Sequence, residues 1–166
     1  MLQHRAVPYL SGLTDGVIAS RSLRLFGMGE SSVEAQLREK MNAMTNPTLA
    51  PYAKEGEVEL RLTARAETED AALALIAPAE RELRERFGPL VYGVDVPSLE
   101  AVCLTLLGEK ALTLSAAESC TGGLLAKRVT DLPGASRVFK GGVVSYTNEV
   151  KEKALGVPAE LLAQYG

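Results

Sequence analysis

A strict alternation of apolar and polar side chains over residues 57–66 constrains the fold more than any other feature of the sequence. Successive side chains of a β-strand point to opposite faces, so a period of two predicts a strand with one buried face. The apolar positions are Val58, Leu60, Leu62, Ala64 and Ala66, and the polar positions are Glu57, Glu59, Arg61, Thr63 and Arg65. The chain must therefore build a sheet whose other face is wet or meets a partner.

Helical patterns flank this strand on both sides. Before it, an S-x-x-E segment starting at Ser31 predicts a capping box and a helix that runs to Met44. After it, Thr68 is expected to be the N-cap of a second helix, and Pro78 is expected to kink or restart that helix. The predicted apolar stripes are Val33, Leu37, Met41 and Met44 in the first helix, and Ala72, Ile76, Ala79, Leu83 and Phe87 in the second.

The rest of this region predicts a small sandwich. We expect an irregular tail at the amino terminus, short strands at residues 22–26 and 90–92, and an exposed ordered loop over residues 46–54, where two prolines lie four residues apart. The order strand, helix, strand, helix, strand predicts an α+β unit over residues 19–95, with two helices on one face of a three-stranded sheet.

A second domain is predicted from residue 96 onward. Ser98 should cap a helix with apolar residues at helical spacing, namely Leu99, Val102, Cys103, Leu106 and Leu107. A strand over 111–116, a polar turn, a helix over 124–131, a strand over 138–146 and a helix from Asn148 should follow. Two strands are too few to bury a parallel sheet on both faces, so we expect an incomplete α/β domain, either a fragment or one completed by another chain.

Composition narrows the function classes. The chain has 18 Lys and Arg against 21 Asp and Glu, which disfavours nucleic-acid binding as its main role. Cys103 and Cys120 lack the spacing of a metal site or a disulfide framework. The sequence contains neither a signal peptide nor an apolar stretch long enough to span a membrane. We expect a cytoplasmic protein with no membrane association, no metal and no cofactor.

Residues 118–123 give the clearest indication of a functional site, because small polar side chains lie there just before the start of a predicted helix. Free N–H groups at a helix start favour an anion or a developing oxyanion, and Gly122 and Gly123 would let a ligand approach the backbone. The alternative is purely structural: Ser119 or Thr121 is only an N-cap, and the glycines only make a tight turn.

A serine nucleophile in this turn would need a base. The sequence has a single histidine, His4, in the irregular tail, which disfavours a Ser-His-Asp triad. Lys151 and Lys153 are alternative bases, although most lysines are solvated surface residues.

Two further residues remain open from the sequence alone. Cys120 is a rival nucleophile, because a helix start lowers a thiol pKa, and nothing local decides between it and Ser119. Tyr146 could relay protons, although a strand tyrosine is more often a packing residue.

Several longer strings resemble a known family. The segments 118–125, 133–136, 141–151 and 155–157 closely resemble the CinA family, the competence/damage-inducible proteins. Residues 25–31 and 46–54 resemble that family's middle, KH-like domain. The resemblance therefore extends over essentially the whole chain.

The resemblance implies an architecture and an activity. Complete family members have an amino-terminal domain similar to molybdopterin-cofactor enzymes with ADP-ribose pyrophosphatase activity, a KH-like domain and a carboxy-terminal amidohydrolase. The amidohydrolase deamidates nicotinamide mononucleotide to nicotinate mononucleotide and ammonia. Residues 1–18 would then be the tail of a missing first domain, 19–95 the KH-like domain, and 96–166 a truncated deamidase domain.

The resemblance also implies roles for individual residues. Ser119 would be the nucleophile, Lys151 its base and Tyr146 a supporting group, with Cys120 a bystander. Residues expected around the substrate are Thr121, Gly122, Gly123, Ser145 and Asn148. The family's downstream S-G-I-A-G-P segment has no counterpart before Gly166, so we expect this chain alone to be weak or inactive.

The sequence and the resemblance also bear on binding partners. KH folds often bind single-stranded nucleic acid through a G-x-x-G loop, but none occurs between residues 20 and 95, and that segment is net acidic. Beyond the small-molecule substrate we expect a homodimer and disfavour nucleic acid. The alternative function is a non-catalytic dimerisation or scaffold module, or a single-stranded nucleic-acid-binding module.

Overall fold

The computed structural model describes residues 16–165, and the chain divides into two compact units, Met1–Val96 and Pro97–Gly166. The first fifteen residues of the expected tail, His4 among them, lie outside the described residues. The end of that tail is wrong, because the first strand already begins at Val17, well before residue 22.

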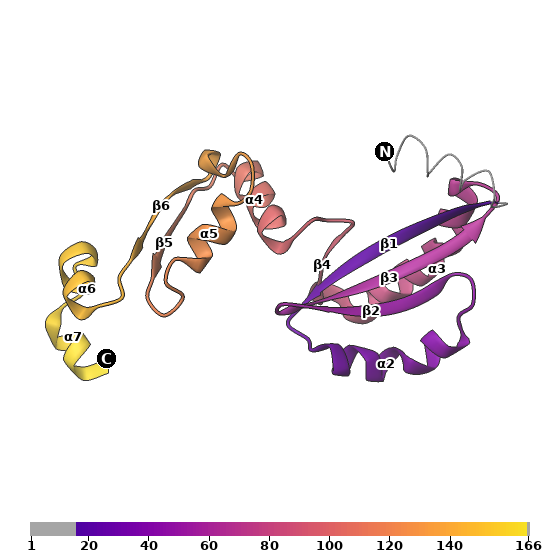
Figure 1. Cartoon of the computed structure of the whole chain (residues 1–166), viewed down its shortest axis with the longest axis horizontal. Helices are drawn as coiled ribbons and strands as arrows, with labels where there is room; N and C mark the ends of the chain where they lie inside the picture. The colour runs from indigo at the N-terminus through magenta and orange to yellow at the C-terminus, as the bar shows by residue number, and fades with distance from the viewer. Residues whose placement is uncertain (1–15, 166) are drawn as a thin grey trace, which may run out of the picture. The chain divides into compact units, whose positions relative to one another are not determined.

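The first unit is a four-stranded antiparallel sheet with two helices on one face (Figure 1). Its elements in chain order are β1 (Val17–Phe26), α2 (Glu30–Ala43), β2 (Thr48–Lys54), β3 (Glu57–Ala66), α3 (Glu69–Phe87), the short 3-10 turn Gly88–Leu90 and β4 (Val91–Val94). The strands lie in the order β2, β3, β1, β4. The α+β fold class is confirmed, with one strand more than the sequence predicted.

The alternation of apolar and polar residues in β3 buries one face of the strand, as the sequence predicts. Val58, Leu60, Leu62 and Ala64 are buried, and Leu60 lies directly opposite Leu23 of β1. The entire predicted stripe of α3 is buried on this face, and α2 adds Val33 and Leu37. One continuous apolar core between the sheet and both helices therefore holds the unit together.

The sequence makes two predictions about α3, an N-cap at Thr68 and a kink or restart at Pro78. The Ala71 N–H donates to Thr68 Oγ1 at 3.2 Å, so the predicted N-cap is confirmed. Pro78 lies inside the helix, which continues without a break to Phe87. The predicted restart at Pro78 is therefore wrong.

Residues 46–54 do not form the predicted loop. Thr48–Lys54 is an edge strand that pairs with β3 alone, with Pro51 opposite Leu60. Proline is tolerated on an edge strand because its missing N–H need not join a second ladder. Asn46 extends the pairing, since its side chain donates to the Arg65 carbonyl and accepts from the Arg65 N–H, both at 2.9 Å.

The predicted capping box at the start of α2 is also wrong. The helix begins at Glu30 and the N-cap is Gly29, which offers no side chain to the first turn. Ser31 and Ser32 already lie inside the helix, so neither can cap it. Glu30 instead places an acidic group in the first turn, where it is favoured by the helix dipole.

A buried carboxylate organises the opposite face of the sheet. Glu59 is only 3% exposed. It accepts hydrogen bonds from Arg61 Nη2 and Ser22 Oγ, each at 2.8 Å, and pairs with Arg24 and Lys54 at 3.5 and 3.7 Å. Burial raises the pKa of Glu59, but the hydrogen bonds from Arg61 and Ser22 and the charge of Arg24 outweigh it, so the pKa lies below its usual value.

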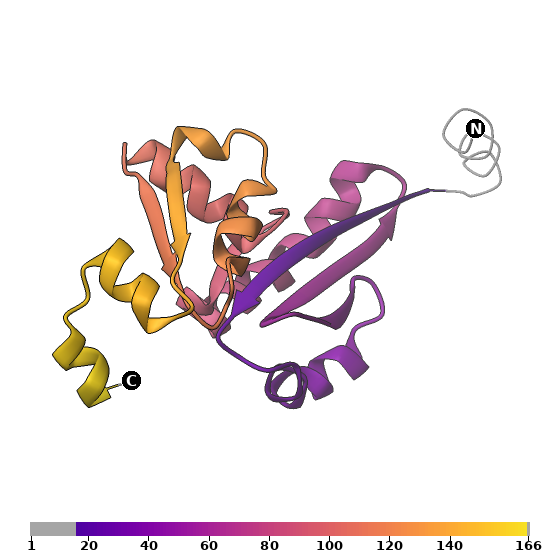
Figure 2. The same ribbon diagram turned by 60° about the vertical axis from the view of Figure 1, so that its left-hand side comes forward.

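The second unit is built around two parallel strands. Its elements are α4 (Leu99–Glu109), β5 (Leu114–Glu118), α5 (Leu124–Thr130), the 3-10 turn Ala135–Arg137, β6 (Phe139–Val144), α6 (Asn148–Leu155) and α7 (Ala159–Tyr165). Strands β5 and β6 lie side by side, and α5 packs against both and contacts α4 (Figures 1 and 2). Ser98 caps α4 as predicted, since its Oγ accepts from the Ala101 N–H at 3.2 Å.

This second unit buries few apolar side chains. Among its described residues only Val129, Ala135 and Val138 are buried apolar ones. The predicted apolar stripe of α4 is not buried, and neither α6 nor α7 contains a buried residue. Exposed large apolar side chains of the unit include Leu106, Leu112, Leu124, Leu125, Val143, Val144, Leu155 and Leu161. Parallel sheets are normally covered on both faces, but here Ser115 and Ala117 of β5 and Val143 and Val144 of β6 are exposed, so part of the sheet is left uncovered by the described residues.

None of the helices within residues 16–165 combines the length and the apolar composition that a membrane span requires.

The core of the first unit can be tested with two leucines of one helix. Leu83 of α3 is fully buried, so we expect Leu83→Ala to lower the free energy of unfolding by about 2–5 kcal/mol. Leu75 of the same helix is 42% exposed, and Leu75→Ala should cost less than about 1 kcal/mol. Urea unfolding followed by circular dichroism measures both. Equal losses in the two variants would contradict the burial described here.

The Glu59 cluster predicts a pH dependence. Because the folded-state pKa lies below the usual 4.5, the cluster stabilises the fold above pH 4.5 and loses that contribution as pH falls through the lowered value. We expect Glu59→Gln to cost about 1.5–3 kcal/mol at pH 7 and clearly less at pH 3, measured by urea unfolding. The control Glu55→Gln removes an exposed carboxylate of the β2–β3 turn and should cost less than about 0.5 kcal/mol at either pH.

Candidate functional site

The candidate site lies where β5 and β6 end. The two strands are parallel and Glu118 is paired with Val144, so their carboxyl ends meet at one edge of the sheet. Ser119 follows β5 directly, and Ser145 and Tyr146 follow β6. The Ser145 N–H donates to the Glu118 carbonyl at 2.7 Å, which extends the strand pairing to this edge. Ligands of α/β sheets bind at this kind of edge.

The turn from Ser119 to Gly123 is tight and depends on its two glycines. Gly122 and Gly123 have φ values of 59° and 99°, a region that side chains rarely adopt. The Gly122 N–H donates to the Ser119 carbonyl at 3.0 Å and closes the turn. A Cβ on Gly123 would lie 3.3 Å from Val144 Cγ2, so β6 also limits the space at this position.

Glu118, to which the sequence analysis assigned no role, holds the start of α5. Its Oε2 accepts from Thr121 Oγ1 and from the Leu125 N–H, and its Oε1 accepts from the Ala126 N–H, all at 2.8 Å. The N-cap of α5 is Gly123, which has no side chain to offer. The carboxylate of Glu118 therefore performs the capping function from outside the helix.

This arrangement corrects two expectations about the helix start. Neither Ser119 nor Thr121 is the N-cap of α5, since that position belongs to Gly123. The N–H groups of Leu125 and Ala126 are not free for an anion, because Glu118 already occupies them. An oxyanion at this site must be bound by other donors.

The environment of Glu118 keeps its carboxylate ionised. The residue is 6% exposed, and burial raises its pKa. The hydrogen bonds from the Ala126 and Leu125 N–H groups and from the Thr121 hydroxyl outweigh burial, so the pKa lies below its usual value. The available signal in the sequence was an acidic residue at the end of a strand, just before a turn whose helix start is glycine.

The structure brings some of the predicted residues together and leaves others apart. Ser119 is half-buried, while Cys120 and Thr121 are exposed, and the Thr121 hydroxyl is engaged by Glu118. The buried Ser145 donates its hydroxyl to the Glu118 carbonyl at 3.2 Å, so this side chain joins the two strand ends. Its expected contact with substrate stays a prediction.

The predicted base and supporting group come from the segment after β6. Tyr146 is 71% exposed, and Asn148 and Lys151 lie in α6, whose N-cap Thr147 accepts from the Val150 N–H at 3.4 Å. Within the described part of the chain, no hydrogen bond joins Ser119 to Tyr146 or Lys151. The chain therefore holds Ser119 and the segment bearing its expected base at one edge, without a formed dyad.

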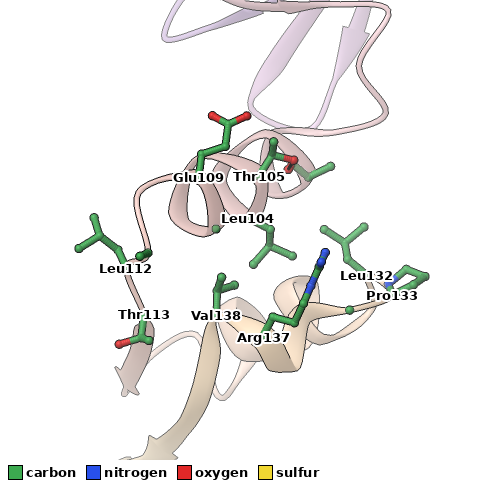
Figure 3. A pocket seen from close by; sticks show the side chains of 13 residues that line it. Leu104, Thr105, Glu109, Leu112, Thr113, Leu132, Pro133, Arg137 and Val138 are labelled. Atoms are coloured by element: carbon green, nitrogen blue, oxygen red, sulfur yellow. Dashed lines mark hydrogen bonds between the residues drawn. The ribbon is translucent and has the colours of Figure 1, made fainter.

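A cavity of about 760 Å³ lies at the opposite edge of the same sheet. It is bounded by α4 and by residues 132–138, and Leu104 of α4 faces Val138 and Arg137 across it (Figure 3). Leu112 and Thr113 precede β5 and Val138 precedes β6, so this space lies at the amino ends of the strands. It is therefore separate from the Ser119 turn.

No group of three or more His, Cys, Asp or Glu side chains within residues 16–165 is arranged to hold a metal ion.

The fold and site together define a class: an antiparallel α+β unit followed by a unit with a serine-bearing turn at the edge of a parallel strand pair. Comparison with protein families assigns both units. The model described as the damage-inducible protein CinA KH domain matches residues 20–93, and the CinA C-terminal domain matches residues 96–166. The chain belongs to the CinA family.

Curated relatives in bacteria agree with this assignment. The chain is 49% identical over 166 residues to a CinA-like protein of Dictyoglomus turgidum and 47% identical to one of Kosmotoga olearia. Each match includes all of this chain and 40% of the relative, so the chain spans about 40% of the length of these curated relatives. A solved structure, the competence/damage inducible protein CihA from Agrobacterium tumefaciens, is 43% identical over 41% of each chain, with a TM-score of 0.40.

The glycine turn makes a prediction about stability. In Gly123→Ala the side chain would meet both a left-handed backbone and Val144, so we expect a loss of about 1–2 kcal/mol in the free energy of unfolding. Gly108→Ala is the matched control, since Gly108 lies in α4 and its new Cβ would be 3.9 Å from Val138. That control should leave stability unchanged or raise it by up to about 1 kcal/mol. Thermal unfolding of the two variants decides the matter.

Proposed function

We propose that this chain carries the nucleophile-bearing part of an amidohydrolase that converts nicotinamide mononucleotide and water to nicotinate mononucleotide and ammonia. The observation that carries the proposal is Ser119, half-buried in a tight glycine turn at the carboxyl edge of a parallel strand pair. This is where a nucleophile can meet a substrate while its backbone is held rigid. The motif around Ser119 resembles that of the family's deamidase.

The reaction divides into two steps at Ser119. In the first, Ser119 Oγ attacks the carboxamide carbon, its proton passes to the base, and the C–N bond breaks as that proton is returned to the leaving nitrogen, releasing ammonia. In the second, water attacks the acyl-serine ester and releases the nicotinate carboxylate with the serine hydroxyl restored. The protons balance with no redox partner.

The oxyanion of each step needs donors from the turn itself. Glu118 occupies the first-turn N–H groups of α5, so these cannot stabilise it. The Cys120 and Thr121 N–H groups donate to no other main-chain group among the described residues. Donors beside the nucleophile lie where an oxyanion hole is needed, and removing one such donor from an enzyme typically costs about 10²–10³-fold in kcat.

Lys151 is the proposed base. A lysine accepts a proton only when it is neutral, which requires removal from water or a nearby cation. No hydrogen bond joins Lys151 to Ser119 among the described residues, and α6 contains no buried residue. We therefore propose that turnover is weak until a covering surface brings Lys151 to Ser119.

The test is ammonia release from nicotinamide mononucleotide by the purified protein. We expect Ser119→Ala to lower kcat by about 10³-fold or more, since loss of a nucleophile removes the covalent route. The neighbouring Cys120→Ala is the matched control and should keep the rate within about threefold. Ser119→Ala at full rate would refute the proposal, and loss of activity in Cys120→Ala alone would move the nucleophile to Cys120.

A further inference from the structure

We propose that Glu118 is the positioning residue of this site: its buried carboxylate holds the turn that aims Ser119, and its main chain joins that turn to the segment leading to Lys151. The inference rests on the proposed function, because it names what orients the nucleophile of that reaction. It assigns Glu118 no contact with substrate.

The first support is the carboxylate itself. Both of its oxygens accept hydrogen bonds, from three donors at 2.8 Å: the hydroxyl of the turn residue Thr121 and the N–H groups of the helix residues Leu125 and Ala126. These bonds run from the last residue of β5 across the turn to the first turn of α5. Ser119 lies inside the loop that they close.

The second support is the main chain of Glu118. Its carbonyl accepts from both the N–H and the hydroxyl of Ser145, at 2.7 and 3.2 Å. Ser145 is buried and lies just three residues before α6, which contains Lys151. One residue thus binds the turn of the nucleophile with its side chain and the segment leading to the base with its backbone.

The third support is the lack of another anchor in this turn. Gly122 and Gly123 have no side chains, and Cys120 is exposed. Within residues 16–165, the bond from Thr121 to Glu118 is the only side-chain hydrogen bond from within the turn 119–123. Without the carboxylate the position of Ser119 would depend on main-chain bonds alone.

Displacement of Ser119 would slow the chemical step more than it would weaken substrate binding. A displacement of about 1 Å in a reacting group can cost about 10²-fold in rate, because the attack geometry is lost while the substrate still binds. Glutamine has nearly the shape of glutamate, but its NH₂ group would face an N–H or hydroxyl donor that now points at a carboxylate oxygen. Glu118→Gln should therefore disturb the turn without opening a cavity.

The experiment measures kcat and KM of the protein for nicotinamide mononucleotide. We expect Glu118→Gln to lower kcat by about 10–100-fold with KM within about threefold. Thr121→Val, which loses the donor but keeps the shape, should lower kcat by a smaller factor, and Thr121→Ser, which restores the donor, should recover most of that loss. This pair also decides the matter if Glu118→Gln does not fold.

The matched control is Glu100→Gln. Glu100 is a carboxylate in α4 of the same unit, 15% exposed and paired with Arg128 of α5, but it has no bond to the Ser119 turn. We expect its kcat to stay within about threefold of the parent even where its melting temperature falls. If Glu100→Gln loses as much kcat as Glu118→Gln, general loss of stability explains both and the inference fails.

A second readout follows the position of Ser119 directly. A serine-reactive fluorophosphonate should label the Ser119 peptide of the parent, detected by mass spectrometry, and label Glu118→Gln at least about tenfold more slowly. Unchanged kcat in Glu118→Gln, beside a full loss in Ser119→Ala, overturns the positioning role and leaves the proposed function standing. Full activity in Ser119→Ala overturns the proposed function itself.

Discussion

Burial of one face of β3 is the constraint on which the first unit depends. The strand lies between β2 and β1, so its apolar side chains meet neighbours on both sides and both helices above. A fully buried leucine contributes about 2–3 kcal/mol through removal from water, and Leu23, Leu60, Leu62 and Leu83 all reach that condition. The opposite face needs no second layer, because Glu59 is neutralised by the cations around it. The same pairing engages Arg24, Lys54 and Arg61, which weakens any case for a phosphate-binding face there.

The second unit lacks that constraint and relies on local hydrogen bonds at the site edge. Its strands are parallel and few side chains are buried, yet the turn after β5 is fully specified by Glu118, Thr121 and two glycines. Hydrogen bonds to a charged carboxylate are stronger than neutral ones, which suits a site that must stay ordered beside an open surface. The Ser119 turn is thus formed in the unit where apolar packing is weakest, and α6, which carries Lys151, contains no buried residue.

The sequence predicts the fold well where one local pattern decides it. β3 and α3 are recoverable because their periodicities are strict and Thr68 is a true cap. β2 is not, because Pro47 and Pro51 favour a loop locally, and only an edge position in the sheet makes proline acceptable. The start of α2 is missed because Gly29 gives no capping signal. The apolar stripe of α4 is present in the sequence, yet none of its described residues is buried. Periodicity alone cannot reveal whether such a stripe is covered.

The sequence likewise predicts some residues of the candidate site and misses others. Ser119 and its glycines can be found because they are contiguous, and the position of Tyr146 and Lys151 after β6 follows from the strand pattern and the family resemblance. Glu118 is missed because its signal, an acidic residue before a glycine turn, is weak, and a carboxylate that caps a helix beginning six residues later follows no short spacing rule. Its presence bears on the proposed chemistry: the N–H groups of Leu125 and Ala126 are occupied, so the oxyanion of the proposed reaction would need donors from the backbone beside Ser119. Gly122 and Gly123, which follow Ser119 closely, have φ values of 59° and 99°, so the geometry of the turn itself favours residues without side chains at both positions, and this also leaves the backbone open to a ligand.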